Sequence, residues 1–486
     1  MVEKKFDYRY LLLLILILGL ILRVYHINYP FSGHISIKET DYAGMAKMMM
    51  EEGKYFTPRG YFLPPHNNVF FPAWIVIGSW TFFGQSELAA RIPFVIMGLL
   101  SIILVFLIGK ELSNKNIGLI AAFFMAVSPM MAYFSRNVQG ECPLIFFSLL
   151  SIYFFIMFKK NNNFLLLISS GFFLLLATMS KLTMLYLLFF YFLYYLKYRN
   201  EFKISFLKTS TFLAIPIIPT LIYIIYSSSL AHCYGAESFI PSVALFNLKG
   251  IIYRIIYLVG YVNLIVFLLF LLFIYYIIKH KKIKEFDYVV IIWFFSYLLC
   301  YMAVFNKASI GNIYYLISFI PPILLGASKV FNIFLEKWRF EFNALIIIAI
   351  ILTSFLTLFV LYDIQYPYPE AGLALSKIIK EGDTIYRIGD GSVCYYAGHF
   401  CSQHSGYEDD AKVTGYLYKG YDYLSIFGGE LDDLLEDPDA KEFLENNYNL
   451  LTKIEGKANL FSGRFMSYNK PPYEYIYINK NIKKPS

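Results

Sequence analysis

Apolar segments long enough to cross a lipid bilayer recur through the first three quarters of this chain, and no other feature restricts its fold as strongly. A hydrocarbon core about 30 Å thick is crossed by a helix of about 20 apolar residues. Each such segment must be helical, because the backbone finds no water to bind inside the bilayer. Only 16% of the 486 residues are charged, against roughly a quarter in soluble domains. The sequence therefore predicts a polytopic α-helical membrane protein.

Eleven spans are expected, at about 10–29, 90–109, 117–134, 143–158, 164–179, 182–196, 210–227, 255–278, 288–305, 311–328 and 344–362. The first span follows Lys4, Lys5 and Arg9, as the core of a signal peptide would. No small-residue cleavage site follows Leu22, so we interpret the segment as a membrane helix.

Basic residues gather in the loops on the same side of the membrane as the N-terminus, for example at Lys159, Lys160, Lys281 and Lys282. The short loops of the opposite side hold five basic residues, which are Arg136, Lys181, Lys249, Arg254 and Lys307. The positive-inside rule then places the N-terminus in the cytoplasm and the C-terminal region outside a prokaryotic cell membrane. The net charge of +8 is explained by this orientation, and we expect no nucleic-acid partner.

Two parts are expected along the chain: a transmembrane part over 1–365, with a long outer loop at about 30–89, and a small soluble α/β domain over 366–486. Within the loop, Val69 to Phe83 is too short to span and is expected to lie in the interface or to re-enter the membrane. The last part holds 18 acidic and 13 basic residues and strand-like runs such as DTIYRI and YEYIYIN. Cys394 and Cys401 could form a disulfide there, and their spacing leaves this open.

Two carboxylates in the long outer loop are candidates for chemistry. Glu39 and Asp41 lie between Gly33 and Gly53, in a run that predicts a helix. Residues two apart on a helix point to different faces, so these two need not act as a pair. They are either ordinary solvated acids or a general base held at the membrane surface.

Other polar residues are expected on the same membrane face as these acids. Arg136 and Glu141 lie in SRNVQGE, and Lys181 lies in ATMSKLT with scarcely any loop around it. Charges at such depth are costly and tend to mark ligand sites, although snorkelling to the headgroups is the simpler explanation. The first loop adds further candidates, which are Arg59, His66 and Arg91. Together these residues suit an anionic lipid headgroup.

The order of segments resembles the GT-C glycosyltransferases that take a sugar from a polyprenyl phosphate. The most similar group contains the dolichyl-phosphate-mannose protein mannosyltransferases and the bacterial lipid A aminoarabinose transferase. Five stretches within about 10–330 match its motifs in order: KETDYAGMAKMM, FGQSELAARIPFVIMGLLSIILVFLIGKEL, GLIAAFFMAVSPMMAYFSRNVQGECPLIFF, ATMSKLTML and NIYYLISFIPPILLGA. The resemblance implies a GT-C-like membrane fold and a hexosyl or pentosyl transferase that is mannosyltransferase-like.

The resemblance also implies roles for single residues. Asp41 fits the family carboxylate in one variant of the first motif, and Glu39 is the alternative. Asp41 would deprotonate or orient the acceptor hydroxyl in an inverting transfer, and cations would stabilise the lipid phosphate as it leaves. The expected donor-binding residues are Lys181, Arg59, Arg136, Arg91, Glu141, His66, Asn312 and Tyr315. Glu141 replaces a usual Asp and Asn312 a common His, which leaves the sugar open, and the acceptor can be a protein, a lipid or a glycan.

No cofactor is implied, because no His/Cys cluster has metal-ligand spacing, and a catalytic divalent metal is unsupported. The main alternative is a polytopic transporter or flippase of lipid-linked sugars, which would place charges near the bilayer midplane or break helices in matching halves. A second alternative is another GT-C class, such as an oligosaccharide transferase or a sugar-lipid polymerase, but the WWDYG signature of the oligosaccharide enzymes is absent. A membrane anchor for an active outer domain is a third, with Asp390, His399 and His404 as its polar residues.

Overall fold

The computed structural model describes residues 7–33, 36–56, 61–63, 71–202, 205–230, 248–280, 283–304, 313–389, 391–404, 417–457 and 472–482. The chain divides into two compact units. The first, here called the membrane unit, comprises 1–27, 91–229 and 235–358. The second, here called the sheet unit, comprises 28–90, 230–234 and 359–486. The expected outer loop is therefore part of the same unit as the C-terminal region.

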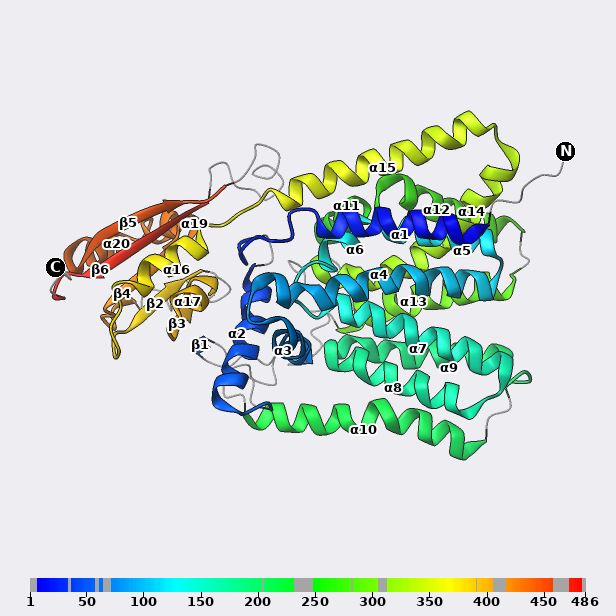
Figure 1. Ribbon diagram of the computed structural model, residues 1–486, viewed down its shortest axis with the longest axis horizontal. Helices are drawn as coiled ribbons and strands as arrows, with labels where there is room; N and C mark the ends of the chain where they lie inside the picture. Colours follow the sequence, from blue (N-terminus) through cyan, green and yellow to red (C-terminus); the bar gives the residue numbers. More distant parts are fainter. Residues whose placement is uncertain are drawn as a thin grey trace. The chain divides into compact units, whose positions relative to one another are not determined.

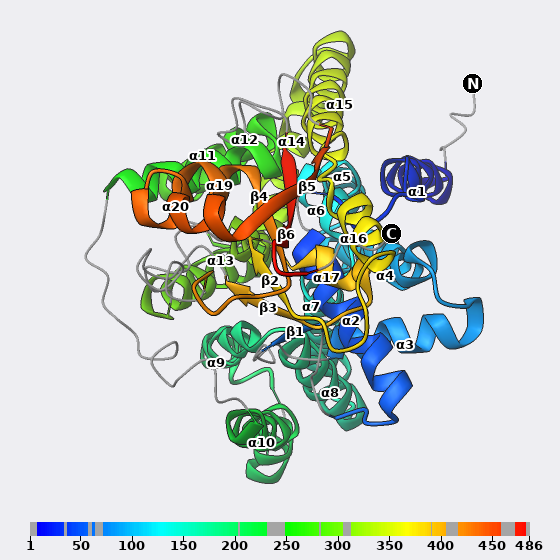
Figure 2. The ribbon, with the colours of Figure 1, turned by 90° about the vertical axis from the view of Figure 1, so that its left-hand side faces the viewer.

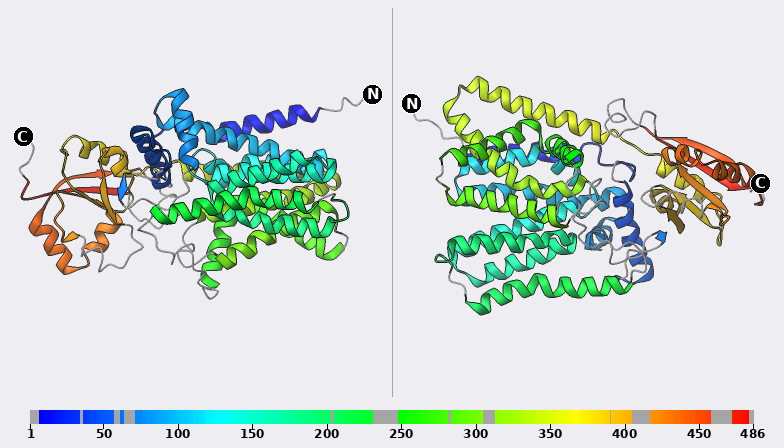
Figure 3. Two further views of the ribbon diagram at one scale, coloured as in Figure 1. Left: turned by 90° about the horizontal axis from the view of Figure 1, so that it is seen from below. Right: turned by 180° about the vertical axis from the view of Figure 1, so that it is seen from behind.

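The membrane unit is built of helices that run alongside one another (Figures 1 and 3). Its helices are α1 (Tyr8–Val24), α4 (Glu87–Leu112, which begins in the sheet unit), α5 (Lys115–Val127), α6 (Pro129–Phe134), α7 (Glu141–Asn161), α8 (Phe164–Ser180), η1 (Leu182–Leu185), α9 (Tyr186–Tyr198), α10 (Phe206–Leu230), α11 (Leu248–Val262), α12 (Leu264–His280), α13 (Glu285–Val304), η4 (Ile313–Phe319), α14 (Ile320–Lys337) and α15 (Phe340–Tyr362). Neighbouring helices α7 and α8 pack along their length, as do α12 and α14.

Five helices among the described residues are long and apolar enough to cross a membrane, and a sixth span results if α11 and α12 count as one. The predicted polytopic helical fold is confirmed, although its eleven expected spans do not all form single long helices. The segment expected at 117–134 is divided at Ser128, because Pro129 cannot continue the hydrogen bonding of α5 and instead begins α6. The segment expected at 255–278 bends by 110° between α11 and α12.

Asn263 accounts for this second break. Its φ of 95° lies in the left-handed region, which Asn adopts more readily than most residues and which ends a helix. Its Nδ2 donates to the carbonyl of Ile350 at 3.1 Å and approaches the hydroxyls of Thr353 and Ser354 at 2.7 and 2.9 Å. The amide therefore fixes the bend against α15.

Exposure to lipid distinguishes the helices from one another. In the apolar window of Tyr314–Lys337, which comprises most of η4 and all of α14, 89% of residues are buried within the protein, against 22% in that of α15. The exposed face of α15 carries large apolar side chains, among them Leu345, Ile348, Leu352, Phe355 and Phe359. Such a continuous apolar face is stable in hydrocarbon, where it needs no protein partner.

The sheet unit contains a six-stranded mixed sheet of order β1-β3-β2-β4-β6-β5 (Figures 1 and 2). Its elements are α2 (Ser36–Glu52), β1 (Phe62–Leu63), α3 (Phe71–Phe83), α16 (Tyr368–Ser376), β2 (Ile385–Ile388), α17 (Ser392–Ala397), β3 (Cys401–His404), β4 (Tyr423–Phe427), α19 (Gly428–Leu434), α20 (Pro438–Asn447), β5 (Tyr448–Glu455) and β6 (Tyr473–Asn479). Strands β1 to β4 pair in parallel, and β6 pairs antiparallel with both β4 and β5. Strand β1 comes from the expected outer loop, so this loop contributes an edge of the sheet.

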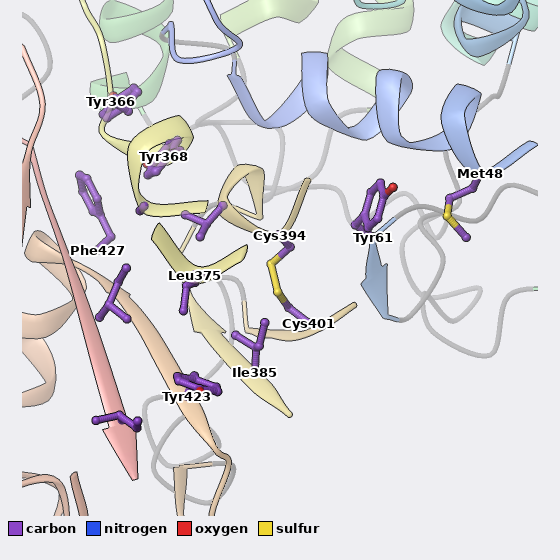
Figure 4. Packing of buried hydrophobic residues seen from close by; sticks show 14 of the residues in the cluster. Met48, Tyr61, Tyr366, Tyr368, Leu375, Ile385, Cys394, Cys401, Tyr423 and Phe427 are labelled. Carbon is purple, nitrogen blue, oxygen red and sulfur yellow. A yellow bond between two sulfur atoms is a disulfide. The ribbon is translucent and has the colours of Figure 1, made fainter. Parts of the chain in front are cut away.

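One core of the sheet unit lies beneath α16 and α17 (Figure 4). Central strands β2 and β4 are buried at every position, as expected for parallel strands covered on both faces. In β6 every second residue is buried, including Ile476 and Ile478, because alternate side chains face opposite sides of a strand. The disulfide between Cys394 and Cys401 lies in this core, so the bond left open by the sequence is present.

Candidate active site

Helix α2 carries both carboxylates that the sequence singled out. Glu39 is in its first turn, where a negative charge is favoured by the helix dipole. Neither Glu39 nor Asp41 is solvated, since their exposed fractions are 1% and 2%. The alternative of ordinary solvated loop acids therefore does not fit the structure.

Asp41 has an unusual environment for a carboxylate. Both of its oxygens are buried and receive no hydrogen bond from the part of the chain that the structure describes. Its ion pair is with Lys38, one turn earlier, at 3.7 Å from Nζ to Oδ2. Buried polar groups are nearly always hydrogen-bonded, because an unmade bond costs about 1–3 kcal/mol. A buried carboxylate in this state is a candidate for binding a group that the protein does not itself supply.

A second cluster lies within the membrane unit, where α8 ends and α7 begins. The ammonium of Lys181 lies 2.5 Å from Oε1 of Glu141 and 4.1 and 4.0 Å from the ring centroids of Tyr314 and Tyr315. Lys181 caps the C-terminus of α8 and Glu141 opens α7, so the helix dipoles favour both charges. Three residues predicted separately from sequence, Lys181, Glu141 and Tyr315, are thus brought together. We call Lys181, Glu141, Tyr314 and Tyr315 the lysine cluster.

The lysine cluster offers the positive charge of Lys181 to an anion, and Glu141 already neutralises part of that charge. The side chains of Lys181 and Glu141 are 19% and 6% exposed, so water screens their attraction only in part. Two tyrosine faces within 6 Å of an ammonium stabilise its charge further. A phosphate bound here would share the lysine with Glu141.

The other described cations of the prediction have a different environment. Nη1 of Arg91 donates to the carbonyl of Ile27 at 3.0 Å, and Nη2 of Arg136 donates to that of His26 at 2.8 Å. Both arginine residues are buried, and their hydrogen bonds hold the chain where it leaves α1. These contacts give them a structural role, and donor binding by Arg91 and Arg136 stays a prediction.

Gln139 is a polar residue that the sequence did not single out. It lies in the turn between α6 and α7, two residues before Glu141, and is 1% exposed. Neither amide atom has a hydrogen-bond partner in the described part of the chain. In the sequence, Gln139 cannot be distinguished from other amides in polar turns. Its position inside SRNVQGE, beside Glu141, was the available signal that it could belong to the site.

The remaining predicted residues lie outside what the structure describes: Arg59, His66 and Asn312. Of the polar residues considered in the C-terminal region, Asp390 and the side chain of His404 also lie outside it. His399 is half-buried, and its Nδ1 lies 3.0 Å from the carbonyl oxygen of Phe400. Within the described ranges, no group of three or more His, Cys, Asp or Glu residues could hold a metal ion.

The helical membrane unit and the small mixed sheet have the fold of the GT-C membrane proteins, as comparison with solved structures shows. The profile of the dolichyl-phosphate-mannose-protein mannosyltransferase family matches residues 67–224, which confirms the resemblance predicted from the motifs. An uncharacterized protein of Aquifex aeolicus (strain VF5) is 30% identical over 142 residues. That alignment covers 29% of this chain and 28% of the relative, so the chain matches little more than a quarter of that protein's length.

Solved structures share the fold over most of the chain. ArnT from Cupriavidus metallidurans, crystallised with undecaprenyl phosphate, superposes with a TM-score of 0.62 at 11% identity, covering 96% of this chain and 97% of that one. The oligosaccharyltransferase of Archaeoglobus fulgidus superposes with a TM-score of 0.59 at 12% identity, covering 86% and 67%. At such identities the likeness establishes the fold, and together with the family match it supports a membrane glycosyltransferase.

Proposed function

We propose that this protein transfers a sugar from a polyprenyl phosphate to an acceptor hydroxyl at the outer membrane face, with inversion at the anomeric carbon. The proposal rests on the environment of Asp41. Its oxygens are buried and lack hydrogen-bond donors among the described residues, so an acceptor hydroxyl would supply the missing partner. General-base assistance of this kind typically accelerates a reaction by roughly 10²–10⁴-fold.

The bonds change in a single displacement. The acceptor oxygen attacks the anomeric carbon, the bond from that carbon to the phosphate oxygen breaks, and the acceptor proton passes to Asp41. The lipid phosphate leaves with the bonding electrons and one more negative charge. One displacement at the carbon inverts its configuration. Glu39, two residues earlier and equally buried, is the alternative base.

Lys181 is proposed to neutralise the charge that develops on the phosphate. Cations placed in advance where charge develops are commonly the largest catalytic contribution in a water-poor site. The ammonium is held by Glu141 and two tyrosine rings, so it needs little reorganisation during the reaction. Undecaprenyl phosphate in the ArnT crystal is consistent with a lipid phosphate as the ligand of this fold.

The donor is a dolichyl or undecaprenyl phosphate sugar, and the acceptor a protein, lipid or glycan. Members of the matched family are described as mannosyltransferases, which favours a hexose. The sheet unit is proposed to bind the acceptor or to cover the site. The C-terminal region lies outside the cytoplasm in this proposal, where the disulfide between Cys394 and Cys401 is stable.

Separate Asp41→Asn and Glu39→Gln variants and their combination test this function. Membranes that contain each variant are supplied with a radiolabelled polyprenyl-phosphate sugar, and transfer to acceptor is counted. We expect Asp41→Asn to lower transfer by at least about 10²-fold. Glu51→Gln, an exposed carboxylate at the end of the same helix, is the matched control and should transfer normally. Normal transfer by the double variant would refute the assignment.

A transporter of lipid-linked sugars is the second candidate, favoured by the 110° bend between α11 and α12. Broken helices line the sites of many transporters. Proteoliposomes distinguish the two functions. A transporter moves the lipid-linked sugar between leaflets without forming a glycosylated product, whereas the proposed enzyme forms that product and free polyprenyl phosphate.

A further inference from the structure

One part of the sheet unit contacts the segment that carries Asp41 at three separate places. Helix α17 and strand β3 are joined by the disulfide between Cys394 and Cys401, seven residues apart. Both elements touch the stretch from Phe31 to Leu63, which enters, forms and leaves α2. All of these residues belong to the sheet unit.

The contact on α2 itself is a hydrogen bond between two hydroxyls. Oγ1 of Thr40 and Oγ of Ser392 are 3.0 Å apart, and neither residue is exposed to solvent. Thr40 directly precedes Asp41, and Ser392 lies two residues before Cys394. This hydrogen bond therefore fixes the rotation of α2 about its axis next to Asp41.

The entrance to α2 is held by the two tyrosines of α17. The backbone N–H of Phe31 donates to the hydroxyl of Tyr396 at 2.6 Å. The ring of Tyr395 packs edge-on against Phe31, with the ring centroids 5.7 Å apart, and against Tyr61 at 6.0 Å. The chain before α2 and the residue before β1 therefore meet on one turn of α17.

The exit from α2 is held by β3. The backbone N–H of Cys401 donates to the carbonyl of Tyr61 at 3.2 Å, and the next residue, Phe62, pairs with Cys401 in the sheet. Figure 4 shows Tyr61 beside the disulfide, with Met48 of α2 on its far side. The disulfide thus links the element that contacts Thr40 to the element that contacts Tyr61.

We propose that Thr40, Ser392 and the disulfide between Cys394 and Cys401 are positioning residues for Asp41. The inference rests on the proposed function, in which Asp41 is the base. None of these residues touches the reacting atoms. They fix helix α2, which carries Asp41, and the disulfide keeps α17 and β3 at a constant separation.

Thr40→Val and Thr40→Ser form the first test, since valine keeps the shape of threonine without its hydroxyl and serine keeps the hydroxyl. One buried hydrogen bond typically contributes about fivefold to an equilibrium. We expect Thr40→Val to lower kcat about fivefold or more while the KM for the donor is unchanged, because a different cluster binds the phosphate. Thr40→Ser should restore kcat. Equal kcat values for the two variants would overturn the proposal.

The disulfide is tested with a Cys394→Ser/Cys401→Ser variant followed by hydrogen–deuterium exchange. We expect faster exchange in peptides covering 38–48 than in the unaltered protein, with no change in peptides of α20, which belongs to the same unit. Thr40→Val should then lower kcat less in this background than alone, because the two changes share one mechanism. Unchanged exchange at 38–48 contradicts the role of the disulfide.

The two proposals fail in distinguishable ways. If Asp41→Asn transfers sugar normally, the proposed function is wrong. If Asp41→Asn is inactive while Thr40→Val behaves like Thr40→Ser, the function stands and the positioning role is refuted. Should the variant without the disulfide fail to fold, the Thr40 pair still decides the outcome.

Discussion

Removing one charge at a time from the lysine cluster separates a phosphate-binding site from a purely structural ion pair. Lys181→Met deletes the cation, and Glu141→Gln deletes the anion but keeps an oxygen that accepts a hydrogen bond. The two side chains are 2.5 Å apart, so at an effective dielectric constant of about 20 their attraction is about 7 kcal/mol before screening. Breaking such buried pairs typically costs about 3–5 kcal/mol, and partial exposure of Lys181 places the loss nearer 2–3 kcal/mol.

Ligand binding should respond to the two changes in opposite directions. A phosphate oxygen about 3 Å from the ammonium would be roughly 6 Å from Glu141, where two like charges repel by about 3 kcal/mol at the same dielectric constant. Screening reduces this, so we expect Glu141→Gln to bind polyprenyl phosphate about tenfold more tightly. Lys181→Met loses a charge-assisted hydrogen bond worth about 1.5–3 kcal/mol, and should bind about 10–150-fold more weakly.

The assay measures two quantities on the same nanodisc preparations: the apparent unfolding temperature, and the Kd for a short-chain polyprenyl phosphate. Both single variants should unfold at lower temperature than the unaltered protein. Only Lys181→Met should weaken binding. If Glu141→Gln weakens both stability and phosphate binding, the pair is structural and the assignment of Lys181 to the donor phosphate is wrong.

Three further predictions concern buried polar groups. Gln139→Met should raise the unfolding temperature, because it removes a buried amide without a hydrogen-bond partner among the described residues, which costs about 1–3 kcal/mol. It should also lower transfer if the amide binds substrate, and unchanged transfer would exclude that role. Asn263→Ala should lower the unfolding temperature, since it removes the bonds to α15 and puts alanine, which tolerates a positive φ less well than asparagine, at a φ of 95°, whereas Asn263→Gly should lose only the bonds. Arg387→Met leaves the buried carboxylate of Glu474, whose Oε1 lies 2.8 Å from Nη1, without its cation, and should destabilise the sheet unit by about 3–5 kcal/mol in chemical unfolding. Lys453→Met, on the exposed strand β5, should leave the unfolding free energy almost unchanged.

Local patterns in the sequence were sufficient to predict several helices and to name three residues that the structure brings together. Apolar runs predicted spans at 90–109 and 143–158, and the structure has helices at Glu87–Leu112 and Glu141–Asn161. Motif order singled out Lys181, Glu141 and Tyr315 from three distant segments. Their contact is tertiary, so no local pattern contains it, and depth in the membrane was a reason only to single out the charged residues.

Other features depend on contacts that no local pattern contains. Strand β1 is two residues long, and it is a strand because it pairs with β3 more than 300 residues later. Arg91 and Arg136 look like surface cations in sequence but bind carbonyls at the end of the first helix. Asn263 had a usable signal, since a lone Asn inside an apolar run often ends a helix.

The lipid that remains bound to purified variants tests the central claim most directly. Each protein is extracted in mild detergent, and its bound lipids are identified by mass spectrometry. We expect Asp41→Asn to retain a polyprenyl-phosphate sugar, because the donor binds and is not consumed, and Lys181→Met to retain little of it. Absence of any polyprenyl-phosphate sugar from Asp41→Asn, or equal amounts in the two variants, would contradict the division between a base on α2 and a phosphate site at Lys181.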